Sequence, residues 1–169
     1  MIKIYTDGSC DNSLNKTRVG AREGGWGAVI NLPDNSKREL SIGTYYNTSS
    51  ARMELRAVVA VLGIYKDKGI PITIFSDNKY VTSAFSEGWV FNWERTKWKK
   101  KGKMRENHDL WKRFLIHFRE MHENGIELKL NWIKGHDGHP DNERADFLAN
   151  NARKKRVDMI PDGDPWRSN

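Results

Sequence analysis

Two β-branched segments, each followed by an acid and separated by a helical segment, constrain the fold of this chain more than any other feature. The first spans residues 2–6 and is followed by Asp7 and Gly8, a pair that favours a turn and so ends the predicted strand. The second spans residues 72–76 and is followed by Asp77. A strand, a crossover helix and a second strand pair in parallel with a right-handed connection. We therefore expect the two strands to be neighbours, with both acids at one edge of a sheet.

The remaining sequence predicts further strands and helices around this unit. A polar loop over residues 11–25 leads into two short strands, at residues 26–30 and 37–46, which form an antiparallel meander with the first strand. The crossover helix begins at Ser50, and its apolar positions recur at helical spacing until residues 68–71 end it. Further helices are predicted at residues 79–85 and 107–121 and from residue 140 onward, and a fifth strand at residues 127–133.

Composition limits the class of protein. The 169 residues fit one domain, which we place at residues 1–152, followed by a polar and flexible tail at residues 153–169. The net charge of +7 and the pI of about 9.5 favour an anionic partner such as nucleic acid. A single cysteine excludes an internal disulfide and favours a reducing compartment. Since the sequence has neither a signal-peptide pattern nor a membrane-spanning apolar run, we expect a soluble, cytoplasmic protein.

A third acid lies on the crossover helix. Glu54 shares a helical face with Ala57, Val58 and Val61, the face that must pack on the sheet. For an arbitrary helix, pairing with a nearby arginine or with the helix dipole is the commoner explanation of such a glutamate. Here three acids converge, and because like charges repel, the cluster requires cations or raised pKa values. Oxygen ligands suit Mg²⁺ or Mn²⁺, and two such ions about 3.5–4 Å apart are a device for attack on phosphodiesters, so the pattern indicates a nuclease or phosphoryl-transfer enzyme.

A glycine-flanked loop and the helix after it supply the remaining candidates. His136 lies in the loop, and histidine is the residue type that most often serves in proton transfer, so this position suits proton transfer or product release. The helix that follows carries three polar side chains in its first turns: Asn142, Glu143 and Asp146. Asp146 would close the acidic cluster as a fourth carboxylate. The alternatives are that the histidines serve only as polar loop residues, or that His136, Asp137 and His139 form a zinc site, which lacks thiolate ligands.

Four segments in order resemble the type 1 ribonuclease H family: Tyr5-Thr-Asp-Gly-Ser-Cys10, Arg52-Met-Glu-Leu55, Phe75-Ser-Asp77 and Lys134-Gly-His-Asp-Gly-His-Pro-Asp-Asn-Glu-Arg-Ala-Asp146. The resemblance extends from Met1 to about Ala152. It implies the α/β ribonuclease H-like fold, in which a five-stranded mixed sheet of order 3-2-1-4-5 is flanked by helices. It also implies endonucleolytic hydrolysis of the RNA strand of RNA–DNA hybrids by two-metal-ion catalysis, leaving 5′-phosphate and 3′-hydroxyl ends.

The resemblance assigns a role to each acid. Asp7 would bridge two metal ions, Glu54 and Asp77 would complete the ion on the leaving-group side, and Asp146 would help hold the ion that activates water. His136 would aid proton movement or product departure. Two further residues would lie near that site: Asn142 and Glu143. The implied cofactor is two Mg²⁺ ions per active site, with Mn²⁺ as the alternative. The implied partner is an RNA–DNA hybrid duplex, bound by a monomer without membrane contact.

The segment between Trp89 and Glu106 differs in composition from the rest of the chain. It interleaves tryptophans with basic residues, and residues 95–105 contain no acid, which suits phosphate neutralisation beside flat apolar surface. The alternative is a solvated helix whose tryptophans pack inward, and we expect packing to be at least half of the role of Trp89 and Trp93. For the lysines at 99–101 we expect phosphate contact. The segment resembles the basic handle of the family, which grips the DNA strand of the hybrid.

The loop before Glu54 matches the place where the family reads the minor groove and holds a DNA phosphate. Thr and two amides are common at its last three positions, whereas this chain has Ser49, Ser50 and Ala51. Because Ala51 has no side-chain donor, 2′-hydroxyl recognition would use backbone groups near Gly8 and Cys10. The candidate substrate-binding residues are Gly8, Ser9, Cys10, Ser49, Ser50, Arg52, Trp89, Asn92, Trp93, Trp98, Lys99, Lys100, Lys101 and Asn107.

Two other functions remain as alternatives. A noncatalytic nucleic-acid-binding module would keep the groove and lose the chemistry, and the presence of all four acids argues against it. A DNA nuclease or resolvase of the same superfold is disfavoured by the basic segment and by the His136 loop, although fold alone does not decide between substrates.

Overall fold

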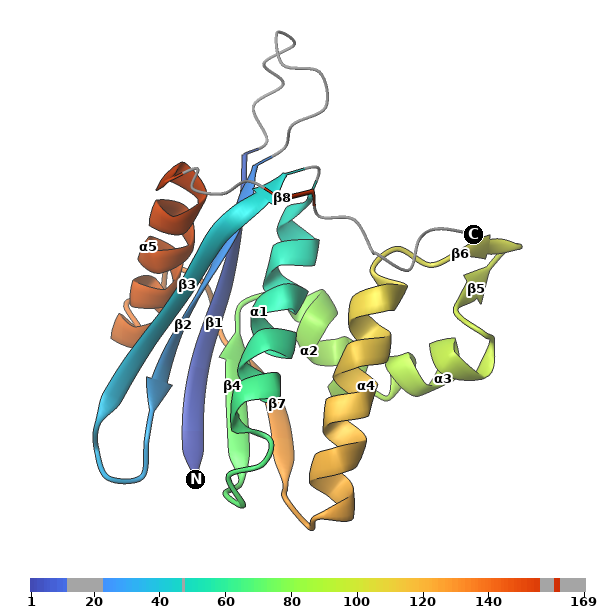
Figure 1. The fold of residues 1–169 in the computed structure, drawn as a ribbon, viewed down its shortest axis with the longest axis horizontal. Helices are drawn as coiled ribbons and strands as arrows, with labels where there is room; N and C mark the ends of the chain where they lie inside the picture. The colour runs from blue at the N-terminus through green and yellow to red at the C-terminus, as the bar shows by residue number, and fades with distance from the viewer. Residues whose placement is uncertain (12–22, 47, 156–159, 162–169) are drawn as a thin grey trace, which may run out of the picture.

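The structure is a computed structural model that describes residues 1–11, 23–46, 48–155 and 160–161. Its centre is a six-stranded sheet with the strand order β7-β4-β1-β2-β3-β8 (Figure 1). The strands are β1 (Ile2–Cys10), β2 (Gly24–Asn31), β3 (Lys37–Tyr46), β4 (Ile72–Ser76), β7 (Leu128–Trp132) and β8 (Ile160–Pro161). The predicted five-stranded mixed sheet is confirmed, since β7 occupies the place of the predicted fifth strand. The short β8 adds a parallel partner to β3.

β1 organises the sheet because its two halves pair differently. Residues 2–5 pair in parallel with residues 72–75 of β4, while antiparallel pairing with β2 continues as far as Cys10. The predicted turn at Asp7 and Gly8 is therefore wrong, because β1 passes through both residues. What stops before Asp7 is the parallel pairing with β4. The acid consequently still lies at the carboxyl end of the parallel pair.

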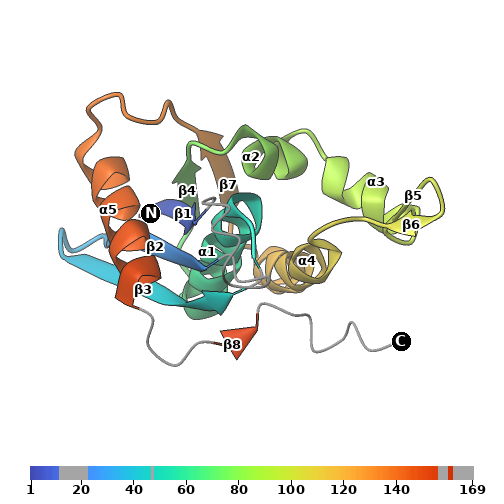
Figure 2. The ribbon, with the colours of Figure 1, turned by 90° about the horizontal axis from the view of Figure 1, so that it is seen from above.

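The helices lie on both faces of the sheet. Figure 2 shows α1 and α4 on one face and α5 on the other. Side-chain caps begin the first two helices. The Ser49 hydroxyl accepts a hydrogen bond from the Arg52 backbone N–H, and the side-chain amide oxygen of Asn78 accepts one from the Val81 backbone N–H, each at 3.2 Å. The helices are α1 (Ser50–Tyr65), α2 (Lys79–Ser86), α3 (Trp89–Arg95), α4 (His108–Glu123) and α5 (Pro140–Lys155).

Two predicted irregular segments fall mostly beyond the described residues. Of the loop predicted at residues 11–25, residues 12–22 lie outside them, and β2 already begins at Gly24. Of the tail predicted from residue 153, residues 156–159 and 162–169 lie outside them. In the described part of this tail, α5 continues to Lys155 and β8 pairs with β3.

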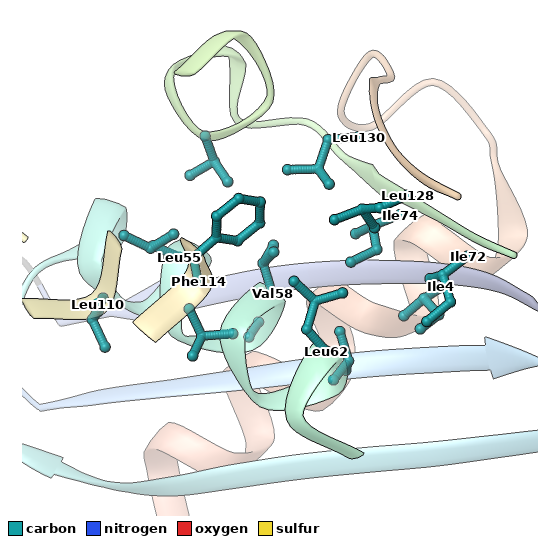
Figure 3. Close-up of a cluster of buried hydrophobic side chains, with 14 of the residues drawn as sticks. Ile4, Leu55, Val58, Leu62, Ile72, Ile74, Leu110, Phe114, Leu128 and Leu130 are labelled. Carbon is teal, nitrogen blue, oxygen red and sulfur yellow. The ribbon is translucent and has the colours of Figure 1, made fainter. Parts of the chain in front are cut away.

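The main core lies between the sheet and the pair α1 and α4. The predicted apolar face of α1 is confirmed, because its residues are buried and α1 packs against β1 and β2 (Figure 3). Each large side chain buried in this way contributes about 1.5–3 kcal/mol to folding, so the position of α1, and of Glu54 on it, is fixed by many contacts. The labelled core residues are Ile4, Leu55, Val58, Leu62, Ile72, Ile74, Leu110, Phe114, Leu128 and Leu130.

α5 packs on the opposite face through small residues. A Cβ added at Gly27 of β2 would lie 2.6 Å from the Ala145 carbonyl oxygen and 2.7 Å from the Ala149 nitrogen. A Cβ added at Gly43 of β3 would lie 1.7 Å from the Ala152 carbonyl oxygen. Because the helix backbone rests directly on these glycines, α5 has little freedom to slide or rotate on the sheet. The glycines therefore fix the position of α5 on the sheet, and with it the positions of the side chains that α5 directs toward β1.

The basic segment, residues 89–106, forms α3 and a hairpin, which we call the basic subdomain. After α3, the short strands β5 (Lys99–Lys100) and β6 (Lys103–Met104) pair as an antiparallel hairpin, which the sequence did not predict. Figure 1 shows α3, β5 and β6 projecting from the body of the protein beside α4. Within the described ranges, no helix combines the length and the apolar character needed to cross a membrane.

Candidate active site

Three carboxylates from separate elements converge at one edge of the sheet. Asp7 lies on β1, Glu54 in the first turns of α1 and Asp77 directly after β4. One oxygen of each carboxylate lies within 4.8 Å of the others. Gly8 permits this approach, because a Cβ at that position would lie only 2.3 Å from the Glu54 backbone nitrogen. The structure thus brings together three of the four acids that the sequence analysis selected.

Burial makes the cluster energetically costly while it carries only negative charge. Asp7 and Glu54 are each 6% exposed. Burial, with a further contribution from the charge of Asp77, raises the pKa of Asp7 from 3.8 to about 7. Burial and the adjacent charge of Asp7 raise the pKa of Glu54 well above its ordinary value. These carboxylates ionise fully at neutral pH only if a cation compensates them.

The donor set fits a hard divalent cation. All three groups offer carboxylate oxygens, the ligand type that small divalent ions prefer. Glu54 Oε2 is buried and, among the described residues, has no hydrogen-bond partner, a state that costs free energy unless an ion or a donor satisfies it. Within the described part of the chain, these three acids are the only group of three or more His, Cys, Asp or Glu side chains whose ligand atoms lie close enough together to share an ion. The alternative zinc site of His136, Asp137 and His139 is therefore not formed.

Asp146 reaches the same region from the opposite face of the sheet. It lies in the second turn of α5, half-buried, and its charge and hydrogen bonding contribute to the raised pKa of Asp7. It is not a member of the group whose oxygens all lie within 4.8 Å of one another. Its Oδ1 accepts a hydrogen bond of 2.9 Å from the Asn150 amide. Of its two predicted neighbours, Asn142 is buried and Glu143 is exposed.

The loop that carries His136 contacts Asp77 at its start and β1 at its end. At its start, a Cβ on Gly135 would lie 2.5 Å from Asp77 Oδ2, so this loop residue lies directly against the carboxylate. At its end, the His139 ring packs on Tyr5, with 4.6 Å between ring centroids. Between these contacts His136 is exposed and adopts a left-handed conformation with a φ of 53°. The loop therefore carries an exposed imidazole one residue after the position that contacts Asp77.

Several predicted groove residues are committed to internal contacts. Arg52 is buried and pairs with Asp109 through two hydrogen bonds, one of 2.8 Å, and it also donates to Asn107 at 3.3 Å. The Ser49 hydroxyl caps α1. The Ser9 hydroxyl accepts a hydrogen bond from Arg153 at 3.0 Å. These contacts hold the three side chains in place, and their direct contact with a substrate stays a prediction.

The basic subdomain exposes its lysines and buries part of its aromatic surface. Lys99, Lys100 and Lys101 are exposed, whereas Trp98 is only 6% exposed and packs into the core. Trp93 lies between the Arg105 guanidinium, 4.8 Å from its ring centroid, and the aromatic rings of α2 and α4. The expected inward packing is thus observed for Trp93, while the burial of Trp98 was not predicted. Trp89, Phe91 and Asn92 keep exposed surface beside the lysines.

Three residues beside the acids were missed in the sequence. Trp132 donates its indole N–H to the Asp77 carbonyl oxygen at 2.9 Å, and Lys79 lies over the Trp132 ring at 4.3 Å from its centroid. Register would have found Trp132, because it pairs with Ser76, the residue before Asp77. Helical spacing would have found Asn150, because residues four apart are neighbours on a helix.

Comparison with known proteins gives one consistent result. The sequence model of the RNase H family matches residues 1–154. Ribonuclease H of Desulforamulus reducens is 37% identical over 155 residues, which cover 91% of this chain and 88% of that protein. The crystal structure of LC9-RNase H1, described as a type 1 RNase H with the type 2 active-site motif, is similar with a TM-score of 0.74 and 27% identity over 92% of this chain and 73% of that one. LC11-RNase H1, solved in complex with an RNA/DNA hybrid, has the same fold at 20% identity and a TM-score of 0.62, covering 93% of this chain and 99% of that one.

Proposed function

The chain belongs to the ribonuclease H family, and we propose that it hydrolyses the RNA strand of RNA–DNA hybrids at the cluster formed by Asp7, Glu54 and Asp77. It is an enzyme of the nuclease class, in keeping with its relatives. The observation that carries the proposal is the convergence of three carboxylates, two of them buried, from β1, α1 and the position directly after β4. Such a cluster costs folding free energy, and its retention in a folded protein is explained by cation-assisted chemistry.

The cofactor we propose is Mg²⁺, with Mn²⁺ as the alternative and two ions in each site. Asp7, Glu54 and Asp77 would hold one ion, and Asp7 with Asp146 would hold the other. Such ions stabilise the charge that develops on a phosphodiester during in-line displacement. The buried, unsatisfied Oε2 of Glu54 supports this choice, because a hard cation satisfies it without a protein donor.

The residues of the chain itself supply positioning and proton movement. His136 would transfer a proton or assist departure of the product, and the contact of its neighbour Gly135 with Asp77 supports this role. With the metal ions bound between them, the carboxylates would define the position of the scissile phosphate at the sheet edge. Asn142 and Glu143 lie at the start of α5, on the same helix as Asp146, and would act on the site only indirectly.

Hybrid binding uses the basic subdomain and the loop before α1. Lys99, Lys100 and Lys101 are exposed on the projecting hairpin, where they would contact phosphates of the DNA strand. Ser49, Ser50 and backbone groups near Gly8 and Cys10 would line the minor groove. The hybrid-bound relative LC11-RNase H1 has the same fold, and a hybrid duplex is the substrate that this arrangement of acids and lysines suits.

We further propose that the protein acts as a monomer in the cytoplasm. One chain supplies all four acids and the basic subdomain, so catalysis needs no residue from a second copy. The single cysteine, Cys10, is compatible with a reducing compartment.

A cleavage assay tests this function against the alternatives. End-labelled RNA–DNA hybrid, double-stranded RNA, double-stranded DNA and single strands are each incubated with the protein, with Mg²⁺ or with a chelator. We expect cleavage of the RNA strand of the hybrid only, and only with metal. Equal cleavage of double-stranded DNA would favour the resolvase-like alternative. Binding of the hybrid without cleavage in any metal would favour the noncatalytic module.

Asp7→Asn identifies the site. It removes one charge without changing the size of the side chain, so hybrid binding should persist while cleavage is lost. Unchanged cleavage by this variant would show that the chemistry occurs elsewhere in the protein.

A further inference from the structure

The fourth acid, Asp146, is held by a side chain that belongs to none of the motifs described above. Asn150 lies one turn later on α5, and its amide nitrogen donates to Asp146 Oδ1 at 2.9 Å and to the Asp146 backbone oxygen at 3.0 Å. The Asn150 carbonyl oxygen accepts a hydrogen bond of 2.8 Å from the Ser9 hydroxyl. The Ser9 oxygen in turn accepts one of 3.0 Å from Arg153 Nε. The four side chains form a continuous series from Arg153 to Asp146.

The chemistry of the donors fixes the direction of this series. An arginine guanidinium can only donate hydrogen bonds, so the Ser9 oxygen must be the acceptor in its contact with Arg153. Asp146 presents only acceptors to Asn150, a carboxylate oxygen and a backbone carbonyl oxygen, so the Asn150 carbonyl oxygen must face Ser9 and accept the Ser9 hydroxyl proton. The Asn150 amide nitrogen is consequently directed toward Asp146. The amide orientation follows from the network and does not depend on an assignment of oxygen and nitrogen within Asn150 alone.

The backbone on both sides of this network is rigid. Ser9 lies on β1 two residues after Asp7, and Asn150 lies on α5, whose neighbouring Ala149 rests on Gly25 and Gly27 of β2. A change in the Asp146 rotamer would therefore break hydrogen bonds rather than move the helix. A carboxylate oxygen with two lone pairs can accept from an amide and still bind a cation.

We propose that Asn150 is a positioning residue, which turns the Asp146 carboxylate toward the Asp7 side of the cluster through the hydrogen bonds that connect it to Ser9 and Arg153. The inference rests on the proposed function, because it concerns how the chain presents a metal ligand. Residues that orient a ligand in this way commonly change metal affinity by about 10–100-fold when they are removed. Asn150 is thus expected to act on metal affinity and not on hybrid binding.

The test measures metal binding directly, by calorimetric titration of the intact protein with Mg²⁺ alone. Asn150→Ala should weaken the binding of Mg²⁺ by about 10-fold or more, while hybrid affinity in chelator stays within about 2-fold of the original. Asn151→Ala is the matched control, because it is the same change on the next residue, about 100° around the helix axis. It should change neither quantity.

Ser9→Ala keeps the test valid if Asn150→Ala fails to fold. It removes the hydroxyl that fixes the amide, so Mg²⁺ binding should weaken in the same direction. In the Asn150→Ala background the same change should have little further effect, since both act through one series of contacts.

The possible failures are distinguishable. If the unmodified protein binds no Mg²⁺ in the titration, the proposed function is at fault. If it binds Mg²⁺ and Asn150→Ala binds equally well, Asn150 positions nothing. Independent, multiplicative effects of Ser9→Ala and Asn150→Ala would show that the two residues do not act together.

Discussion

Replacing Asp7 by asparagine should stabilise the metal-free protein while it abolishes cleavage. The raised pKa of Asp7 means that the folded protein binds this proton more tightly than the unfolded chain does. Ionisation of Asp7 in the folded protein lowers the free energy of unfolding. This loss is absent below about pH 4, grows as the pH rises, and is complete above about pH 7. A pKa raised from 3.8 to about 7 corresponds to a cost of about 4 kcal/mol.

Asp7→Asn removes most of this loss of stability, although the asparagine amide is still buried. In chelator at pH 8 we expect Asp7→Asn to raise the free energy of unfolding by about 2–4 kcal/mol, which in a protein of this size raises Tm by roughly 5–15 °C. At pH 4 the difference should fall below about 1 kcal/mol, because the original carboxyl is then protonated. Addition of Mg²⁺ should stabilise the original protein more than the variant.

Urea unfolding at both pH values measures these differences. Asp67→Asn is the control, because Asp67 is an exposed acid paired with Lys66, and loss of a surface pair changes stability by about 1 kcal/mol or less. If Asp7→Asn were no more stable than the original protein at pH 8, or if its advantage were the same at pH 4, the electrostatic account of the cluster would be refuted.

Two further predictions concern other parts of the molecule. Replacing Lys99, Lys100 and Lys101 together by alanine should weaken hybrid binding and reduce the slope of log affinity against log salt by up to about 3, since each lysine that neutralises a phosphate adds about one to this slope; an unchanged slope would show that the hairpin does not contact phosphates. Arg52→Ala should cost about 3–5 kcal/mol in urea unfolding, because it leaves Asp109 buried without its cation. Arg119→Ala should lower the free energy of unfolding by about 1 kcal/mol or less, because the pair of Arg119 with Glu94 has similar geometry but is exposed. Equal losses of stability in the two variants would contradict the importance of burial.

The sequence predicted the sheet and the acids because both leave local signals. β-branched runs separated by a helix define the parallel pair β1 and β4, and the acids that follow them must lie at one edge. Glu54 was identified because helical spacing places it on the face that packs on the sheet. These features depend on short-range pattern, which a single sequence displays directly.

The prediction for Gly8 failed because glycine has more than one use. Asp-Gly is a common turn signal, but here Gly8 continues β1 and leaves room for the backbone of α1 to approach to within contact. Only the packing of two distant segments distinguishes these uses. The same applies to Gly27 and Gly43, whose requirement comes from α5, about 100 residues later in the sequence.

The interior of the basic subdomain was predicted least well. Lys97, Trp98 and Lys101 adopt left-handed backbone conformations, which residues other than glycine seldom adopt. This path buries Trp98 and forms the β5–β6 hairpin, whereas composition alone suggested an exposed aromatic surface. Long-range hydrogen bonds such as that between Ser9 and Asn150, 141 residues apart, likewise leave no local pattern.

The docking of α5 on the glycines of β2 and β3 has a consequence for synthesis of the protein. β1, α1 and β4 leave the ribosome before the helix that carries Asp146 has been translated. The growing polypeptide consequently lacks the proposed fourth metal ligand until residues 140–155 have been synthesised. On the proposed mechanism, hydrolysis of hybrids therefore requires this late helix, and a nascent chain that ends before it should cleave nothing.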